Sequence, residues 1–234
     1  DEDMQDTLLN VLRSVDTPTV CNAIEAAQGK RGFNNFTKAT MVASAPEEKS
    51  VVGYALTAKI AATSAPKEPA ESVKERRMAY YKYMAEGQRP SVAVIEDCDF
   101  PDCVGAFWGE INTTVHKGFG VSGVVTNGVV RDLGDLPTGF PVIAGSIGPS
   151  HAFVHVREFG KPVSVFGLAV EEGDLVHADR HGALVIPSLV IPSLQHAIEK
   201  LIATERLVLD PASKPDFDFE AFAKAWAAFE AART

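Results

Sequence analysis

The chain has 234 residues, a net charge of −9 and 46% hydrophobic residues, which is typical of a globular protein with one large domain or one domain and a tail. The acidic balance argues against a surface that binds the phosphate backbone of nucleic acids. Lys59 interrupts the longest apolar run, so no segment is predicted to span a bilayer, and the acidic start does not resemble a signal peptide. Three cysteines without C-x-x-C spacing indicate free thiols. We therefore expect a cytoplasmic protein without nucleic-acid or membrane partners.

The first half of the chain predicts helices and strands in alternation. An apolar stripe at helical spacing predicts a helix over 4–15, and a second helix over 16–29 ends at Gly29. Beyond it we expect two strands, a helix, a strand, a helix and a strand, over residues 40–46, 51–60, 69–87, 91–97, 107–118 and 121–126. This alternation is typical of an α/β fold.

The second half predicts mostly strands, followed by two helices. The strands fall over residues 141–147, 162–170, 174–179 and 182–187. The helices cover 189–206 and 216–232, and a polar, proline-containing linker over 209–218 joins them. Together with the first half, this pattern predicts an α/β sandwich whose central sheet is partly rolled, not a plain doubly wound fold. The last helix carries an aromatic stripe that must pack on its own core or on another subunit.

The segment 105–135 carries the first candidate for a binding site. If a helix begins near Gly109, the backbone N–H groups of Glu110, Ile111 and Asn112 are free at its first turn. Such a terminus favours a carboxylate or a developing enolate oxygen, and a glycine lets a ligand approach the backbone. The alternative is that Gly105 and Gly109 only form a tight turn.

Arg131 and Asp132 form the second candidate. Asp132 is a hard oxygen donor, and a single carboxylate with waters is a common way to hold Mg²⁺. Glu110 or Asp135 could then hold the metal's waters. The guanidinium fork of Arg131 matches a substrate carboxylate. The alternative is a local salt bridge, worth ~0–1 kcal/mol if exposed.

Other motifs are better explained by local structure. His151 and His155 have i, i+4 spacing but lack the glutamate of a zinc motif, and their segment resembles a strand. Asp179 and Gly182 suit a turn between strands. The run 118–123 fits G-x-G-x-x-G but precedes a strand, whereas a dinucleotide site requires it to follow one.

The 105–135 segment resembles the signature of the 4-hydroxy-4-methyl-2-oxoglutarate (HMG) aldolase and RraA-like family. That signature is an acid, twenty residues, Arg-Asp, two residues and a second acid, and here it is Glu110, Arg131-Asp132 and Asp135. Further similarities to the family lie in "VDTPTVCNAIEA", "VVGYALTAKI" and "VEEGDLVHADRHGALVIP". The resemblance covers residues 10–206, so we expect a family domain over 1–206 and a C-terminal helical extension over 207–234.

The resemblance implies an αββα sandwich related to swivelling phosphohistidine domains, assembled as a homotrimer or homohexamer with active sites at subunit boundaries. It implies retro-aldol cleavage of a small 2-oxo acid to pyruvate that depends on Mg²⁺ or Mn²⁺, often with oxaloacetate decarboxylation. Asp132 would bind the metal directly and Glu110 through water. Arg131 and the backbone at 109–112 would bind the pyruvyl unit. A neighbouring subunit would add an acid, by position Glu205 or, less well, Glu199.

Two departures and two alternatives accompany this resemblance. Family aldolases commonly have Asp at the position of Glu110, and Asp-Ala where this chain has Asn22-Ala23. RraA-type members inhibit ribonuclease E by protein contact without a metal site; the intact Asp132 favours an enzyme. The third possibility is a lyase that acts on a different hydroxy or oxo acid.

Overall fold

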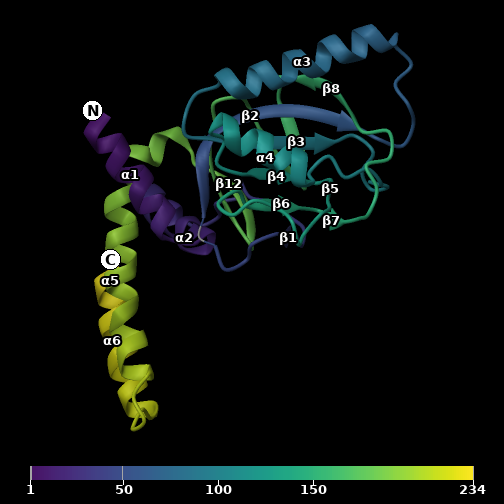
Figure 1. Ribbon diagram of the computed structural model, residues 1–234. Coiled ribbons are helices and arrows are strands. Elements are labelled where there is room, and N and C mark those ends of the chain that lie inside the picture. Colours follow the sequence, from purple (N-terminus) through teal and green to yellow (C-terminus); the bar gives the residue numbers. More distant parts are fainter. Residues whose placement is uncertain (1, 49, 234) are drawn as a thin grey trace. The chain divides into compact units, whose positions relative to one another are not determined.

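The computed structural model describes residues 2–48 and 50–233, and it contains a curled mixed sheet of eight strands (Figure 1). These strands are β1 (Val42–Ala43), β2 (Val51–Ala61), β3 (Ser91–Asp97), β4 (Val124–Thr126), β6 (Val142–Ala144), β8 (His155–Phe159), β11 (Leu175–Asp179) and β12 (Gly182–Val185). Their order is β1-β6-β4-β3-β2-β11-β12, and β8 also pairs with β2. Two small sheets join β5 (Val129–Val130) to β7 (Ser146–Ile147) and β9 (Val163–Val165) to β10 (Leu168–Val170).

The helices are α1 (Glu2–Ser14), α2 (Thr17–Gln28), α3 (Ala70–Glu86), α4 (Glu110–Phe119), α5 (Ile191–Ala212) and α6 (Phe219–Arg233). The chain divides into two compact units. The first runs from the N-terminus to Pro18 and from Asn34 to Pro187, and it holds the sheet. The second comprises Thr19–Phe33 and the chain from Ser188 onward, and it is helical. The predicted boundary at residue 206 falls inside α5. Among the described residues, no helix has the length and apolarity that crossing a membrane requires.

The strand β2 explains why the sheet curls. One edge of β2 pairs in parallel with β3 along Tyr54–Ile60. Its other edge pairs first with β11 and then with β8, both antiparallel, and the register shifts between Lys59 and Ile60. Changing partners along one edge bends a strand and turns the sheet away from a flat layer. The predicted α/β class with a partly rolled sheet is confirmed.

Both faces of the central sheet are buried. In β3, Val92 and Val94 face one hydrophobic core, whereas Ala93 and Ile95 face the other, as the period of two in a strand requires. The first core includes residues of the β9–β10 hairpin, and the second includes Tyr80 of α3. This arrangement accounts for the nearly continuous apolar runs in the sequence, because a strand that is buried on both faces has no polar side.

Most predicted elements are present, with differences at their ends. The strand expected over 40–46 is reduced to the two residues of β1, and β4 begins only at Val124. The predicted linker 209–218 is too long, because α5 continues through Pro211 to Ala212. Proline lacks an N–H, so Pro211 removes the helical hydrogen bond to the carbonyl four residues earlier, and α5 ends one residue later. All three cysteines are free thiols, as expected.

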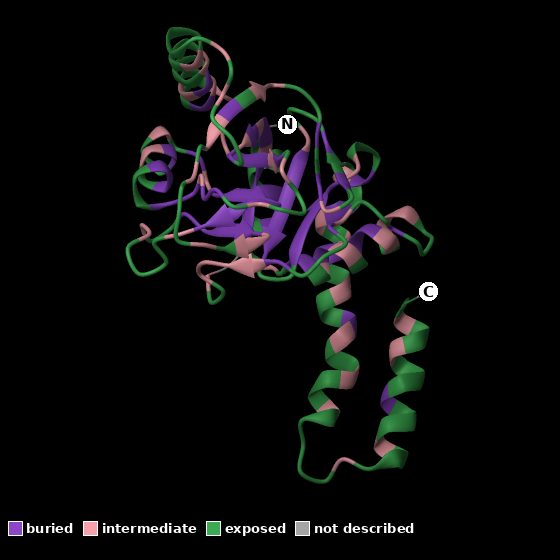
Figure 2. Ribbon diagram, turned by 90° about the vertical axis from the view of Figure 1, so that its right-hand side faces the viewer, coloured by how far each residue is buried: buried purple, intermediate pink, exposed green. Residues whose placement is uncertain are grey.

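The C-terminal helix α6 is largely exposed (Figure 2), and Phe219, Phe222 and Trp226 of its aromatic stripe are among the exposed residues. Phe219, Phe222, Trp226 and Phe229 stack in sequence, with ring centroids 6.0, 5.7 and 5.2 Å apart. Phe219 remains 79% exposed, and Ala225 is the buried residue of the helix. The expectation that the stripe packs on its own core or on another subunit stays a prediction.

A fully buried histidine, His116, lies within α4 and faces the core. His116 is 0% exposed; its Nδ1 lies 2.6 Å from the Asn112 carbonyl and its Nε2 lies 2.7 Å from the Tyr80 hydroxyl. A carbonyl only accepts, so Nδ1 carries the proton and Nε2 accepts from Tyr80. Burial lowers the pKa of His116 to about 4. The imidazole is therefore neutral in the folded protein.

His116 should make the fold sensitive to acid. The unfolded chain takes up a proton near pH 6.5 but the folded chain only near pH 4, so stability is complete above pH 6.5 and falls as the pH drops through this window. We expect a loss of about 2 kcal/mol in the free energy of unfolding at pH 5 relative to pH 7. Urea denaturation of wild type and His116→Gln would measure it. An equal pH dependence in the two proteins would contradict the assignment.

Candidate active site

The candidate site lies beyond the carboxyl ends of the parallel strands β3 and β4. After β4 ends at Thr126, the chain turns at Asn127-Gly128, forms β5 and reaches Arg131. Val130 is held between two neighbours, since it bridges to Trp108 on one side and pairs with Ile147 on the other. The Arg131 N–H also donates to the Trp108 carbonyl at 2.9 Å. Ligands of open α/β sheets bind at this end of the strands.

Asp132 is positioned by the start of α4 more than by Arg131. Its Oδ2 accepts a hydrogen bond from the Glu110 backbone N–H at 2.9 Å. The Arg131 Nε lies 4.0 Å from the same oxygen, which is too long for a hydrogen bond. Asp132 has a φ of +59°, an uncommon backbone conformation that aspartate tolerates better than most residues. Gly109, the residue before α4, has no side chain to cap the helix, so Asp132 from a later segment of the chain caps it instead.

The guanidinium of Arg131 has no hydrogen-bond partner among the described residues. Its Nε is buried and unpaired, although about a third of the side chain is exposed. Leaving a buried donor unpaired costs about 1–3 kcal/mol, and structures retain such groups where a ligand satisfies them. The interpretation of Arg131 and Asp132 as an ordinary salt bridge is thereby weakened. The arrangement offers a fixed cation to an anionic ligand.

Gly109 is needed for a reason that the sequence did not reveal. A Cβ atom at this position would lie 2.7 Å from Asp132 Oδ2 and 2.9 Å from Arg131 Nε. The absence of a side chain at Gly109 thus lets the side chains of Asp132 and Arg131 lie close to its backbone. The expected approach of a ligand to the backbone of Gly109 stays a prediction. Gly109 has an ordinary extended conformation, with φ at −125°, so space and not backbone strain selects glycine.

Gly109→Ala should therefore disturb the site and leave the fold intact. Both contacted atoms belong to side chains that are partly exposed and can change rotamer, so we expect a change in melting temperature of only about 2 °C. The lyase activity that the family resemblance implies should fall at least about tenfold, because displacing reacting groups by about 1 Å has effects of this size. Gly118→Ala in the same helix is the matched control, since nothing lies within 4 Å of its added methyl group. Equal activities of the two variants would contradict this account.

The first turn of α4 is less free than expected. The Glu110 N–H already donates to Asp132, so the predicted trio of backbone donors is reduced to the N–H groups of Ile111 and Asn112. The Asn112 side chain is engaged elsewhere, accepting from the Tyr81 hydroxyl at 2.9 Å and donating to the Phe107 carbonyl at 2.9 Å. Ile111 is 79% exposed and leaves its backbone accessible.

The remaining predicted site residues fall into two places. The Glu110 side chain is exposed at the start of α4. Asp135 is exposed on a turn, and its backbone N–H donates to the Asp132 carbonyl at 2.8 Å. Both acids therefore belong to the same segment as Asp132. Glu205 is partly exposed on α5 and belongs to the helical unit. Its expected role across a subunit boundary stays a prediction.

The donor set suits a hydrated divalent ion held by one carboxylate. Among residues 2–48 and 50–233, no three histidine, cysteine or acidic side chains converge as a metal cluster. In the same part of the chain, no hydrogen bond or ion pair engages Oδ1 of Asp132, whose side chain is 35% exposed. Mg²⁺ keeps several waters and is often held by one or two carboxylates, so the expected metal site at Asp132 does not require such a cluster and stays a prediction.

A buried pair at the strand ends was not predicted. Asp97 ends β3 with 1% exposure, and its N–H donates to Asn127 Oδ1 at 2.6 Å, while the Asn127 amide donates to the Asp97 carbonyl at 3.3 Å. Burial raises the pKa of the Asp97 carboxyl, and its Oδ2 has no described partner. The pair ties β3 to the turn that leads to Arg131. The acidic end of the "SVAVIED" strand was the available signal.

The Asp179 turn and the pair His151 and His155 have structural positions, as expected from the sequence. Asp179 accepts from the backbone N–H groups of Thr17 and His181, both at 2.8 Å, so its oxygens serve the fold. His155 opens β8, and His151 lies before that strand.

Comparison with known proteins identifies the family and agrees with the fold. Residues 17–185 match the family described as RraA-like, Aldolase/RraA. Protein DlpA of Legionella pneumophila is 31% identical over 52% of this chain, which spans only 19% of that protein. A Halalkalibacterium halodurans protein named "Putative 4-hydroxy-4-methyl-2-oxoglutarate aldolase" is 25% identical over 75% of this chain and 74% of its own length.

Solved structures share the fold. The structure of RraAS2 from Streptomyces coelicolor, described as an unusual member of the RNase ES inhibitor RraA protein family, superposes with a TM-score of 0.63 at 21% identity, covering 89% of this chain and 96% of that one. The family match includes the whole segment from Gly109 to Asp135. The chain therefore belongs to the RraA-like family, which includes HMG aldolases and RraA regulators.

Proposed function

We propose that the protein is a metal-dependent carbon–carbon lyase that cleaves a 4-hydroxy-2-oxo acid related to HMG and releases pyruvate. Oxaloacetate decarboxylation is the expected second activity, since both reactions leave the enolate of pyruvate. The observation that carries the proposal is the guanidinium of Arg131, which has no hydrogen-bond partner among the described residues, beside a carboxylate with one unengaged oxygen. The family match and the relative named as an aldolase support it.

The residues of this segment would have different roles in the reaction. Asp132 would hold Mg²⁺ or Mn²⁺ directly, with the Glu110 carboxylate on its waters. A bound divalent ion supplies Lewis-acid stabilisation of the negative charge that develops on the keto oxygen. Arg131 adds a fixed cation at the same oxygen and requires no reorganisation during the reaction. The N–H groups of Ile111 and Asn112 are left to receive the substrate carboxylate at the positive end of α4.

Homo-oligomerisation forms part of the proposal. A homotrimer or homohexamer would bring Glu205 of one copy to the Arg131–Asp132 segment of another and complete the acidic side of the site. A regulator that works by protein contact, such as an inhibitor of the RNase ES type with which RraAS2 is grouped, would need neither the free guanidinium nor the unengaged carboxylate oxygen. These two groups favour the enzyme over the regulator.

An assay for pyruvate tests the proposal. With HMG or oxaloacetate and about 1 mM Mg²⁺ or Mn²⁺, we expect lactate dehydrogenase to report pyruvate, and EDTA to reduce the rate at least about 100-fold. Restoring excess metal should restore the rate, which separates chelation from denaturation. Background rates with both substrates and several divalent metals would contradict the aldolase and decarboxylase assignment.

A further inference from the structure

A pocket of about 590 Å³ lies within the helical unit, and its lining includes no residue of the segment that carries Arg131 and Asp132. Three stretches of that unit line it: the end of α2 with the turn after it, one side of α5, and the end of α6. Pockets that hold small molecules usually have volumes of about 300–1,000 Å³. This one is large enough for a compact metabolite.

The charge of this pocket is opposite to that of the protein. Four permanent cations line it, against the single acid Glu25, although the chain carries a net charge of −9. The cations are Lys30, Arg31, Lys200 and Arg233. None of these five side chains forms an ion pair within the part of the chain that the structure describes. The pocket therefore concentrates unneutralised positive charge.

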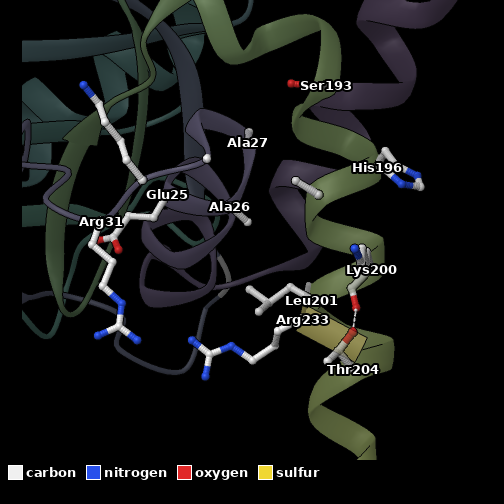
Figure 3. Close-up of a pocket in the computed structure, with 13 residues that line it drawn as sticks. Glu25, Ala26, Ala27, Arg31, Ser193, His196, Lys200, Leu201, Thr204 and Arg233 are labelled. Atoms are coloured by element: carbon white, nitrogen blue, oxygen red, sulfur yellow. Dashed lines mark hydrogen bonds between the residues drawn. The ribbon is translucent and has the colours of Figure 1, made fainter. Parts of the chain in front are cut away.

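The orientation of the two arginines adds to this charge. Figure 3 shows the guanidinium groups of Arg31 and Arg233 pointing into the same region, one from the turn after α2 and the other from the end of α6. The Arg233 guanidinium lies 5.0 Å from the centroid of the Phe229 ring, which restricts its position. Two planar forks facing one space can together bind the oxygens of a phosphate group.

A simpler explanation accounts for the cations one at a time but not for their convergence. Arg31 follows the carboxyl end of α2 and Arg233 lies in the last turn of α6, where a helix favours positive charge. Lys200, however, lies in the middle of α5. Dipole effects give no reason for these segments to line one pocket. Like charges that share a space repel each other until an anion neutralises them.

We propose that this pocket binds a small phosphorylated metabolite, with Arg31 and Arg233 on the phosphate and Lys200 beside it. The small apolar wall formed by Ala26, Ala27, Ala197 and Leu201 suits the rest of such a molecule. The site does not depend on the proposed lyase activity, because its lining contains no residue of the 109–135 segment.

Calorimetric titration of the full chain with pyrophosphate, and separately with citrate, tests the proposal. At about 50 mM salt we expect pyrophosphate to bind with a Kd below about 1 mM and more tightly than citrate. Arg31→Gln and Arg233→Gln should each weaken pyrophosphate binding at least about tenfold. Arg206→Gln is the matched control, because Arg206 lies on α5 outside the pocket and pairs with Asp210.

Three results would overturn the site. They are no pyrophosphate binding at about 10 mM, equal weakening by Arg206→Gln, and tighter binding of citrate than of pyrophosphate. Far-UV circular dichroism of each variant verifies the fold, which exposed substitutions should preserve. A loss of lyase activity would leave this result unaffected, so the two proposals fail separately.

Discussion

Asp132→Asn is expected to reduce pyruvate formation at least about 100-fold, because removing residues that only support a metal ligand already costs about 10–100-fold. The asparagine oxygen can still accept the Glu110 N–H, so the cap on α4 remains and the loss reports the missing negative charge. Titration with Mn²⁺ should show weaker metal binding in the same variant. This second measurement does not depend on knowing the substrate.

The control for this experiment is Asp216→Asn, which removes an exposed acid in the linker before α6. It changes the net charge equally and should leave both metal binding and pyruvate formation unchanged. If Asp132→Asn retained full activity and metal affinity, Asp132 would be only a structural cap, and the interpretation of the site as a metal centre would be wrong.

Arg131→Lys is expected to lower kcat about 100-fold, the cost of removing one fixed donor from a developing oxyanion. Lysine keeps the charge, so it should still attract the anionic substrate and change KM less than kcat. The ammonium group lacks the planar fork that the guanidinium offers. Kinetics in the coupled lactate dehydrogenase assay would separate the two constants.

Arg180→Lys, in the exposed turn between β11 and β12, serves as the matched substitution and should retain wild-type kinetics. A variant at Arg131 that raised KM alone would show that the guanidinium binds substrate without favouring the transition state. Unchanged kinetics at Arg131 would remove it from the site altogether.

The sequence predicted elements that depend on local pattern better than contacts that depend on assembly. The start of α4 near Gly109 was expected, and the helix begins at Glu110. The resemblance to the family signature implied that Glu110 and Asp132 belong to one site, and in the structure the Glu110 backbone N–H donates to Asp132 Oδ2. The partners of β2 could not be predicted, because pairing with β11 and then β8 depends on strands more than 90 residues away in the chain.

Several functional details required coordinates for a physical reason. The side chains that fill the space next to Gly109 belong to Arg131 and Asp132, more than twenty residues later in the chain. A glycine in a sequence does not reveal which atoms lie close to it. Likewise, the positive φ of Asp132 arises from the turn that closes onto Asp135. The cationic pocket joins residues 25–31 to residues 193–233, and no local pattern connects such distant segments.

The composition of the helical unit has a consequence for synthesis of the protein. Thr19–Phe33 is synthesised before the sheet, whereas the helices with which it forms a unit are synthesised after it. The segment includes Val20, Ala23 and Ile24, which are fully buried in the folded protein. The nascent chain thus offers an apolar segment that chaperones can hold, and the helical unit can close only after α5 and α6 have been synthesised.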